Sequence, residues 1–501
     1  MKKIIGNKEL REIMKKAIKD ICIPVGSTLG PTGSNVLISS DLSPFITNDG
    51  VTIASNIESD DIKENAILEI IKEASLKTNE LVGDGTTTTL VLLESIFNEG
   101  LKKIENGKNA IILKQEMNEC LNLVLKKIDE LKTNPTENNF LNIASTSSNS
   151  FEIGSFLTKI FLEMKSKNAI KLDESKNEET YFNIKKGYIL ELENISNLYF
   201  INQKEIELKD CYILILDGYF ENINIITDFI NDSEIKNLII FSNDYSDYVK
   251  EELLSLYLNN NKNIFLINLP DYIKRRHLIC EDLIAVTNCK VKNVNEMLSF
   301  NDLGFSKKII LNEFEICFEI SKNMDNYLNK LNSELISATD EFEINFIQKR
   351  IASINSGLAT IYIGGQTKTE IKEKRMRFED ALNALETSKS GISIGSGITY
   401  LKVLKFDSNN DGDEVIKNAL IEPFKKIYEN CATDYSTYLE IIKNSNFQKV
   451  YNLKNQKLED INTTSVIDPT EVIKVALKNA VSIATMLLTT NYLVINENDL
   501  N

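Results

Sequence analysis

Histidine, closely spaced cysteines and long apolar runs are rare or missing in this chain of 501 residues. The only histidine, His277, follows a run of basic residues, so a histidine-rich metal site and a local Ser-His-Asp signature are both excluded. We expect His277 to be structural. The seven cysteines are scattered, and the closest two are Cys280 and Cys289, so the chain has no Cys-x-x-Cys zinc or redox motif. An odd number of scattered cysteines is typical of a protein whose thiols stay free in a reducing compartment.

The apolar runs are too short for a membrane-spanning protein, and the positive charges are too few for a protein that binds nucleic acid or an anionic membrane. The best apolar run, Ala480 to Leu488, is about half of the ~20 residues that a membrane span needs, and Ser482 and Thr485 interrupt it. We find no secretory signal or transit peptide, and we expect a cytoplasmic protein without membrane contact. The 57 lysines and arginines are outnumbered by 73 aspartates and glutamates, giving a formal net charge of −16. This balance argues against nucleic acid or an anionic membrane surface as a partner.

Glycine (20) and proline (7) are scarce, so tight turns are few. The length suggests about three domains. Apolar residues at helical spacing predict helices near both ends, whereas β-branched runs alternate with helices in the middle, which indicates an α/β layer. This order fits a domain inserted into another, with both termini in one helical domain. The predicted helices are 8–27, 62–81, 87–105, 109–132, 222–231, 246–258, 322–355, 367–388, 413–442 and 469–490, and the predicted strands are 211–216, 237–241 and 263–267.

The sharpest local motif is Gly83–Thr89, with the sequence Gly-Asp-Gly-Thr-Thr-Thr-Thr, between two predicted helices. Glycines let backbone N–H groups approach an anion, and the start of a helix adds partial positive charge. Asp84 is placed to hold Mg²⁺ beside a phosphate, and the threonine hydroxyls add donors. The motif is not a Walker A loop, because no lysine follows and no strand precedes it. Taken alone, it is equally consistent with a turn in which a threonine caps the next helix.

Four further segments suit a phosphate site, although some have an ordinary structural interpretation by themselves. The loop Thr28–Gly33 follows the first predicted helix, and Gly395–Gly397 is another glycine-rich turn. Asn48-Asp49-Gly50 brings a second carboxylate, but in isolation it is more simply a hairpin turn. Asp380 lies within Arg377–Leu382 on a charged helix, whose simplest interpretation is a solvated face.

In this order, these segments resemble the group I chaperonins of bacterial and organellar type, the GroEL-like proteins, and they identify a divergent member. The resemblance implies a multidomain fold of α and α/β parts. A helical equatorial domain is expected from 1–131 and 391–501, a small α/β intermediate domain from 132–186 and 358–390, and an inserted α/β apical domain from 187–357. The matching segments are Thr28–Asn35, Ile46–Val51, Gly83–Thr88, Tyr199–Asn202, Pro270, Arg275–Arg276, Arg377–Leu382, Gly395–Gly397 and Asp468–Thr470.

The resemblance also implies an ATP site with a role for each residue. Asp84 is expected to bind Mg²⁺, and Asp49 and Asp380 to position the attacking water as the catalytic pair. A requirement for K⁺ is left open. Two residues at the base and ribose end depart from the family pattern. Ser396 stands in place of a glycine, and Leu453 is bulkier than the residue that the family has after Asn452. Both departures put nucleotide selectivity in question. The residues expected to contact nucleotide are Thr28, Leu29, Gly30, Pro31, Asp84, Gly85, Thr86, Thr87, Thr88, Gly397, Asn452 and Asp468.

Unfolded client proteins are the partners that the resemblance implies, bound on apolar helices of the apical domain. A heptameric ring is expected, with a second ring left open. A separate lid co-chaperonin is expected, because 241–269 leaves no room for a built-in lid. Apolar stripes at this spacing are more often core than exposed groove. The expected client-binding residues are Ile195, Tyr199, Phe200, Thr227, Ile230, Val249, Leu253 and Leu254.

Two functions from different classes remain open. The first is an ATP-driven chaperone that captures unfolded chains and promotes their folding in a ring cavity. The second is a non-cycling holdase or scaffold with a vestigial ATPase, which the polar Thr227 and the lost ion-pair partner of Arg377 favour. The carboxylates Asp49, Asp84 and Asp380 favour the first, because a passive binder does not need them. A third class, a small-molecule kinase, lacks an identifiable acceptor pocket.

Overall fold

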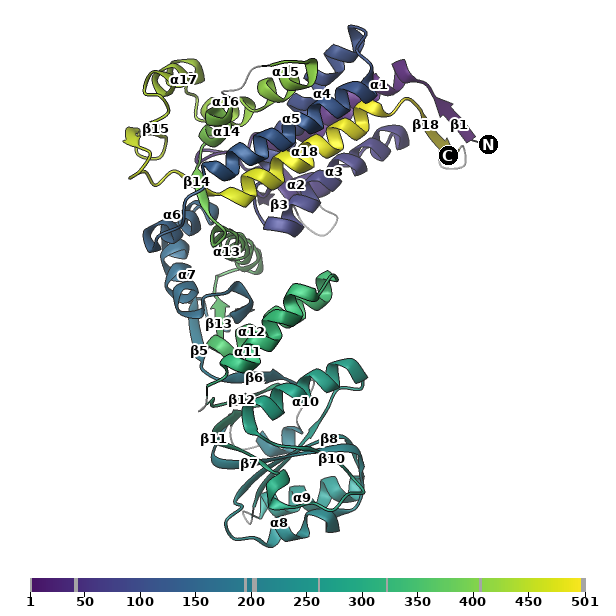
Figure 1. Ribbon diagram of the computed structural model, residues 1–501, viewed down its shortest axis with the longest axis vertical. Coiled ribbons are helices and arrows are strands. Elements are labelled where there is room, and N and C mark those ends of the chain that lie inside the picture. The colour runs from purple at the N-terminus through teal and green to yellow at the C-terminus, as the bar shows by residue number, and fades with distance from the viewer. Residues whose placement is uncertain are drawn as a thin grey trace. The chain divides into compact units, whose positions relative to one another are not determined.

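The computed structural model describes residues 2–39, 44–192, 196–200, 205–259, 262–320, 323–404 and 408–496 (Figure 1). The chain divides into two compact units, which we call the terminal unit (Met1–Leu162 and Gly365–Asn501) and the central unit (Glu163–Gly364). The terminal unit is built from both ends of the sequence, and the central unit is inserted between them. This topology explains the helical, mixed and helical order of the sequence.

The terminal unit is largely helical, with short two-stranded sheets. Its sheets pair β1 (Lys2–Ile5) with β18 (Leu493–Asn496), β2 (Val36–Ile38) with β3 (Phe45–Thr47), β14 (Ile392–Ile394) with β17 (Ile467–Pro469), and β15 (Lys449–Asn452) with β16 (Lys457–Asp460). Its helices are α1 (Asn7–Gly26), α2 (Gly50–Ser55), α3 (Ile62–Val82), α4 (Thr86–Glu105), α5 (Ala110–Glu130), α6 (Glu137–Ser147), α7 (Phe151–Met164), α13 (Lys368–Ser388), α14 (Ile398–Val403), α15 (Asp411–Ala419), α16 (Glu422–Asn430), α17 (Tyr435–Asn444) and α18 (Thr470–Thr489).

The core of the terminal unit is organised around α18, which packs on α3, α4 and α5 (Figure 1). Among the described residues, α18 is the one helix that is long and apolar enough to cross a membrane by length and composition. Its apolar side chains are mostly buried against the neighbouring helices, and Ala476, Ala480 and Ala484 allow close approach. Its hydropathy is therefore that of a helix at the centre of a bundle.

Most predicted helices are confirmed, but two of the longer ones are interrupted. The predicted helix 413–442 is divided into α15, α16 and α17, and Pro423, which lacks an N–H donor, lies in the first turn of α16. The predicted helix 322–355 is divided into α11 and α12, because Asp340 caps a new helix by accepting a hydrogen bond from the N–H of Glu343.

The central unit contains two sheets and the helices that cover them. The larger sheet has the order β6-β12-β11-β7-β8-β9, with β10 also paired to β7, and the smaller has the order β4-β13-β5. Its strands are β4 (Ile170–Glu174), β5 (Tyr181–Lys185), β6 (Tyr188–Glu191), β7 (Ile206–Phe220), β8 (Asn237–Tyr245), β9 (Asn263–Asn268), β10 (Val291–Asn293), β11 (Gly304–Leu311), β12 (Glu315–Phe318) and β13 (Leu358–Ile363). Its α-helices are α8 (Thr227–Asn231), α9 (Asp247–Leu258), α10 (Ile273–Thr287), α11 (Asp325–Ser337) and α12 (Glu341–Ser356), and its 3₁₀ helices are η1 (Lys167–Ala169), η2 (Asn197–Phe200), η3 (Ile223–Ile226) and η4 (Phe300–Asp302).

The parallel strands β7, β8 and β9 are buried on both faces of the larger sheet. Along β7, Ile213 and Ile215 enter one core cluster, while Leu214 and Leu216 enter the other. Successive side chains of a strand point to opposite faces, so a strand covered on both sides needs a continuous apolar run. The predicted strand 211–216 is therefore confirmed as the apolar middle of the longer β7.

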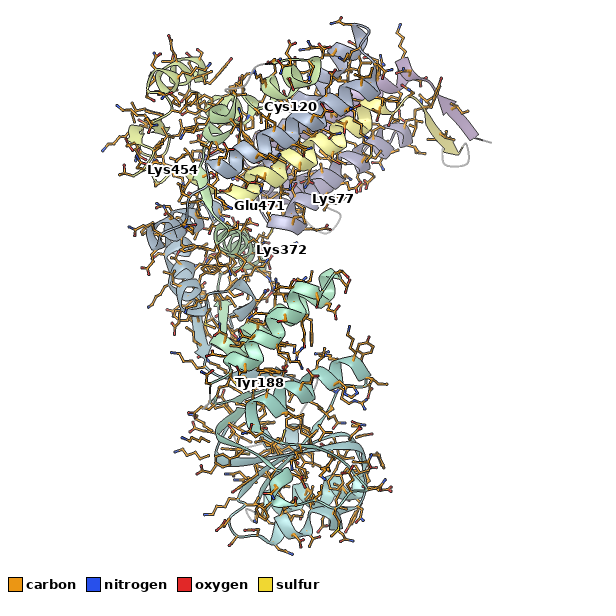
Figure 2. The ribbon with its side chains drawn as sticks, in the orientation of Figure 1. Lys77, Cys120, Tyr188, Lys372, Lys454 and Glu471 are labelled. Carbon is orange, nitrogen blue, oxygen red and sulfur yellow. The ribbon has the colours of Figure 1, made fainter. Side chains whose placement is uncertain are left out.

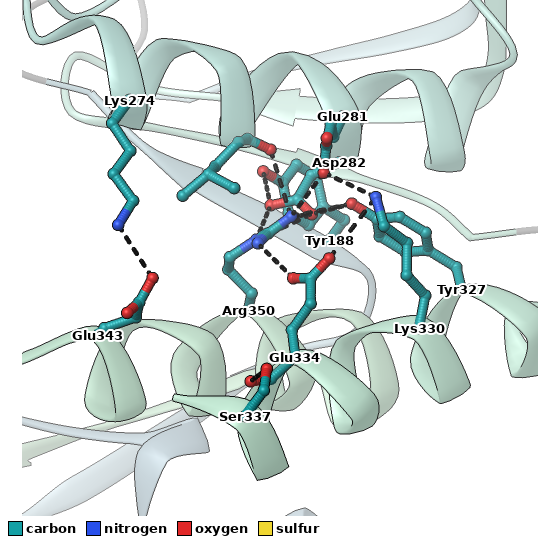
Figure 3. Close-up of polar contacts among 11 residues, drawn as sticks. Tyr188, Lys274, Glu281, Asp282, Tyr327, Lys330, Glu334, Ser337, Glu343 and Arg350 are labelled. Atoms are coloured by element: carbon teal, nitrogen blue, oxygen red, sulfur yellow. Dashed lines mark hydrogen bonds and ion pairs between the residues drawn. The ribbon is translucent and has the colours of Figure 1, made fainter. Parts of the chain in front are cut away.

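A buried ion pair joins α10 to α12 inside the central unit (Figure 3). The Arg350 guanidinium donates from Nε and Nη2 to both oxygens of the Asp282 carboxylate, at 3.0 and 2.9 Å. Tyr327 donates its hydroxyl to the same carboxylate at 2.8 Å, and Tyr188 donates from β6 at 3.3 Å. A buried charge is stable only when it is paired and hydrogen-bonded, and these partners meet that need for the Asp282 carboxylate.

Candidate functional site

The loop between α3 and α4 is shaped by two glycines in the left-handed region. Gly83 (φ 65°) ends α3, and Gly85 (φ 80°) is the N-cap of α4. A Cβ on Gly83 would lie 2.3 Å from the side chain of Asn383, and one on Gly85 would lie 2.6 Å from that of Val472, so only glycine fits either position. The chain thereby presents Asp84 beside the start of a helix of 20 residues.

Within the described part of the chain, the N-cap of α4 makes no side-chain hydrogen bond to the first turn of the helix. The alternative in which a threonine caps this helix is therefore wrong, since the N-cap is Gly85 and has no side chain to offer. The first amides of a helix have no partner within it, so this turn can donate to an anion. The Thr28 and Thr87 hydroxyl oxygens lie 3.4 Å apart, which brings the loop after α1 to the same place.

Asn430, near the end of α16, anchors the loop after α1. Its side-chain amide donates to the carbonyl oxygens of Gly26 and Leu29, each at 2.9 Å. Thr32 donates its hydroxyl to the carbonyl oxygen of Asn430 at 3.2 Å. The position of this loop therefore depends on a helix from the other end of the sequence.

Four carboxyl groups surround the same space. Asp49 is the N-cap of α2 and accepts from the N–H of Thr52 at 2.8 Å, so the helix start holds its charge in place. Burial raises the pKa of Asp84 and of Asp380, and raises the pKa of Asp468 to about 7. The charge of Asp49 raises the pKa of Asp84 and of Asp380 further, and the charge of Asp84 does so for Asp468. These groups repel one another, as expected of a site that receives cations.

A single cavity of about 350 Å³ brings the sequence-predicted residues together. Every residue expected to contact nucleotide or water lines it, from Thr28 near one end of the chain to Asp468 near the other. Its wall includes polar groups at the start of α4 and apolar side chains such as those of Leu29, Ile427 and Leu453. The cavity therefore offers polar contacts that suit phosphates and apolar contacts that suit a ring.

The donor set fits Mg²⁺ bound together with a phosphate. Within the described residues, no three His, Cys, Asp or Glu side chains form a metal cluster by themselves. Mg²⁺ is commonly held by one or two carboxylates with phosphate oxygens and water completing its shell. Asp84, beside the uncapped turn of α4, is the residue suited to this role.

Asn452 and Ser396 both line the cavity, and each also has a role in the local structure. Asn452 is buried and its side chain is already engaged, since it donates to Glu459 and to Ser465 and accepts from the N–H of Lys454. Asn452 thus orders the turn between β15 and β16. Ser396 retains the left-handed backbone (φ 56°) that a glycine adopts easily, so the turn keeps its shape despite the substitution.

Sequence reasoning missed several residues that also line the cavity. Asn48 precedes Asp49, and Thr146, Ser147 and Asn149 come from the end of α6 and the residues after it. Among the described residues, the buried hydroxyl of Ser147 has no hydrogen-bond partner, so it can serve a ligand. The Ser/Thr/Asn run around Ser147 has no distinctive pattern, and nothing in the local sequence marks it.

The expected client-binding residues do not form an exposed groove in this structure. Val249 and Leu253 of α9 are fully buried in the sheet core, and Tyr199 and Phe200 are also buried. Thr227 is exposed, Ile230 and Leu254 are half-buried, and Ile195 lies outside the described residues. The expectation that Val249 and Leu253 present an open stripe is wrong here, because their helical spacing is that of the face packed on β9. The exposed apolar side chains of α9 are Tyr248 (61% exposed) and Leu258 (53% exposed).

Comparison with protein families matches residues 23–498 to the TCP-1/cpn60 chaperonin family. The chain belongs to this family. Chaperonin GroEL 1 of Prochlorococcus marinus subsp. pastoris is 31% identical over 98% of this chain and 88% of its own length. The chloroplastic chaperonin GroEL of Gracilaria tenuistipitata var. liui is 30% identical over 99% of each chain. The chaperonin is thus a divergent relative of GroEL-like proteins, and its general function is that of a chaperone.

Solved structures agree on the fold of this chaperonin. The crystal structure of chaperonin gp146 from bacteriophage EL 2 (Pseudomonas aeruginosa), in the presence of ATP-BeFx, covers 98% of this chain with a TM-score of 0.72 and 18% identity. A second crystal form of the same protein gives a TM-score of 0.63. The multidomain chaperonin fold expected from the sequence is therefore confirmed.

Proposed function

We propose that this chaperonin binds Mg-ATP in the terminal unit, hydrolyses it, and uses the cycle to capture unfolded chains on the central unit and promote their folding. One observation carries the proposal: residues from both ends of the sequence converge on one cavity beside the uncapped start of α4. Unfilled backbone donors and an adjacent carboxylate suit a triphosphate with its metal, and the apolar wall suits a base.

In this mechanism the phosphates bind at the first turn of α4, with the hydroxyls of Thr86 and Thr87 as additional donors. Asp84 would hold Mg²⁺, which would supply positive charge to neutralise the phosphate oxygens. Asp49 and Asp380 orient the attacking water by accepting its hydrogen bonds. Four carboxylates line the cavity, so a further monovalent cation such as K⁺ is compatible with binding of the polyanion.

Asp380→Ala tests the hydrolytic role. We expect this variant to lose ATP turnover by about 10²-fold or more, because the water loses an orienting carboxylate, while ATP affinity changes little. Phosphate release and ATP binding by the full-length chain are the two measurements. Lys372→Ala is the control, because Lys372 is exposed on the same helix and does not line the cavity.

Unchanged turnover in the Asp380→Ala variant would remove Asp380 from the mechanism. A wild-type chain that binds ATP without any turnover would instead favour the non-cycling holdase or scaffold. Arg377, whose altered surroundings motivate that alternative, forms an ion pair with Glu373 on α13 at 2.5 Å. This partner lies on the same helix, so the pair is local to α13.

The wider proposal includes the three-domain division, the partners and the location expected from the sequence. The domains are the equatorial (1–131 and 391–501), intermediate (132–186 and 358–390) and apical (187–357) segments. The chain assembles into a ring of identical subunits, acts on unfolded clients with a separate lid co-chaperonin, and works in the cytoplasm. Electron-microscopic images of the purified protein, with and without ATP, are the direct test of the ring.

A further inference from the structure

Asn430, the last residue of α16, holds the loop after α1 from outside the cavity. Its side-chain amide donates one hydrogen bond to the carbonyl oxygen of Gly26 and one to that of Leu29, each at 2.9 Å. The hydroxyl of Thr32 returns a hydrogen bond to the carbonyl oxygen of Asn430 at 3.2 Å. Leu29 lines the cavity, as does Lys454, which Figure 2 labels, whereas Asn430 does not.

These hydrogen bonds fix the direction of the peptide group between Leu29 and Gly30. A peptide group is planar and trans, so its carbonyl oxygen and its N–H point in opposite directions. Because the Leu29 carbonyl oxygen points to Asn430, the N–H of Gly30 points away from Asn430. Gly30 is exposed and lines the cavity, and among the described residues its N–H has no hydrogen-bond acceptor. This N–H is therefore available to an anion in the cavity.

The loop by itself does not hold this peptide group in one direction. Gly30 has a φ of 96°, which glycine adopts without strain, and the next residue, Pro31, has no N–H to bond back across the turn. Rotation of the central peptide group exchanges a type II β-turn, with a positive φ at its third residue, for a type I turn with a negative φ there. Glycine accepts both. After that rotation the Leu29 carbonyl oxygen would face the cavity and repel an anion.

We propose that Asn430 is a positioning residue for the phosphates of the bound nucleotide, because it holds the Leu29–Gly30 peptide group with its N–H toward the cavity. This inference rests on the nucleotide site proposed above and deepens it. Asn430 acts through the loop and touches neither the nucleotide nor the attacking water. A backbone N–H forms a charge-assisted hydrogen bond with a phosphate oxygen, which is stronger than a neutral one. Loss of this donor leaves Asp49, Asp84 and Asp380 in place, so it should weaken nucleotide binding and preserve the chemical step.

Calorimetric titration of the full-length chain with Mg-ATP, together with steady-state phosphate release, tests this inference. Asn430→Ala removes both donors, and we expect it to weaken ATP binding about tenfold, which is the effect of one charge-assisted hydrogen bond. Asn430→Asp keeps the shape of the side chain but places a carboxylate against two carbonyl oxygens, and we expect it to weaken ATP binding about 10²-fold. At saturating ATP, the kcat of both variants should stay within about twofold of the wild type, whereas a general loss of folded structure would lower it.

Asn444→Asp is the matched control, because Asn444 is an exposed asparagine at the end of α17 that does not line the cavity. Its ATP affinity and kcat should equal those of the wild type. Thr32→Val removes the hydrogen bond that the loop returns to Asn430, and it should weaken ATP binding about threefold. Combined with Asn430→Ala it should add little, because both changes release the same loop from α16.

Unchanged ATP affinity in both Asn430 variants would overturn the inference, as would a kcat that falls as much as the affinity. A wild type that binds no ATP would instead refute the nucleotide site itself. If the wild type binds ATP without turnover, the dissociation constants alone decide. Melting temperatures without nucleotide identify a variant that does not fold. If neither Asn430 variant folds, Thr32→Val decides in their place, and unchanged affinity in that variant would overturn the inference.

Discussion

At the scale of single residues, Asp468 shows how the fold sets the charge of the cavity. The residue lies on β17, paired to β14, where Gly395 leaves just enough room for its carboxylate. Burial raises its pKa from an ordinary 3.8 to about 7, and the charge of Asp84 acts in the same direction. A cation in the cavity would favour the charged form again, so the site is prepared for cationic ligands.

Asp468→Asn should stabilise the protein at high pH and leave it unchanged at low pH. The folded-state pKa lies above the unfolded one, so the stability associated with the protonated carboxyl is complete below about pH 4, is lost as the pH rises toward about 7, and stays lost above it. The shift corresponds to as much as about 4 kcal/mol at pH 8. The measurement is the melting temperature of both proteins from pH 4 to 8, with nucleotide and divalent metal removed. A difference that is the same at both ends of this range would contradict the pKa assignment.

The same scale explains what the two unusual residues of the site do. Ser396 holds a left-handed backbone that costs a non-glycine residue about 1 kcal/mol, and the local structure retains it. Asn452 has its side chain fully engaged in the hairpin turn. Both residues therefore help to set the shape of the cavity wall.

At the scale of elements, α10 and α12 are joined by a buried ion pair and by an exposed ion pair, which allows the two kinds to be compared (Figure 3). Arg350 and Asp282 are both almost completely buried, whereas Lys274 and Glu343 join the same helices at the surface, at 2.9 Å. Desolvation makes the buried pair sensitive to loss of either member, while solvent screens the exposed pair.

Arg350→Met should destabilise the central unit by about 3–5 kcal/mol, because it leaves the Asp282 charge buried without a counter-charge. Hydrogen exchange of amides in α10 and α12 measures this as faster exchange by about 10²-fold or more. The double variant Arg350→Met with Asp282→Leu should recover most of the loss, since no unpaired charge remains. Lys274→Met is the control and should cost less than about 1 kcal/mol. A double variant no more stable than the single one would show that the charge is not the cause.

At the scale of the whole molecule, the cavity proposed to bind nucleotide belongs to the terminal unit and α9 belongs to the central unit. Client capture and ATP turnover should therefore be separable by mutation. Tyr248→Ser with Leu258→Ser removes the exposed apolar side chains of α9, and we expect it to reduce capture of an unfolded protein several-fold. Turnover of ATP should remain within about twofold of the wild type.

Suppression of aggregation of a chemically unfolded protein measures capture, with phosphate release measured in parallel. Leu253→Ser is the comparison variant, because it removes a fully buried side chain and should cost about 2–5 kcal/mol of stability. Any loss of client capture by this variant should be proportional to its loss of folded protein, which melting curves measure. Full capture by the Tyr248 and Leu258 double variant would place the client surface on other elements.

Local patterns in the sequence determined much of this protein. Helical periodicity identified α1, α3, α4, α5 and α18, because a helix that buries one face must repeat apolar residues along it. The glycine-rich motif after α3 and the distant Asp380 indicated one phosphate site, since their backbone and charge requirements are local. The order of these motifs was enough to identify the family.

Only the tertiary structure decided which apolar face is exposed and which polar residues share a cavity. The spacing of Val249 and Leu253 is the same whether α9 faces a client or a sheet, so periodicity cannot distinguish the two. Lys454 and Ser147 join the cavity through contacts between segments far apart in the sequence. Burial and electrostatic environment arise from such contacts, and for that reason they are not written in any local pattern.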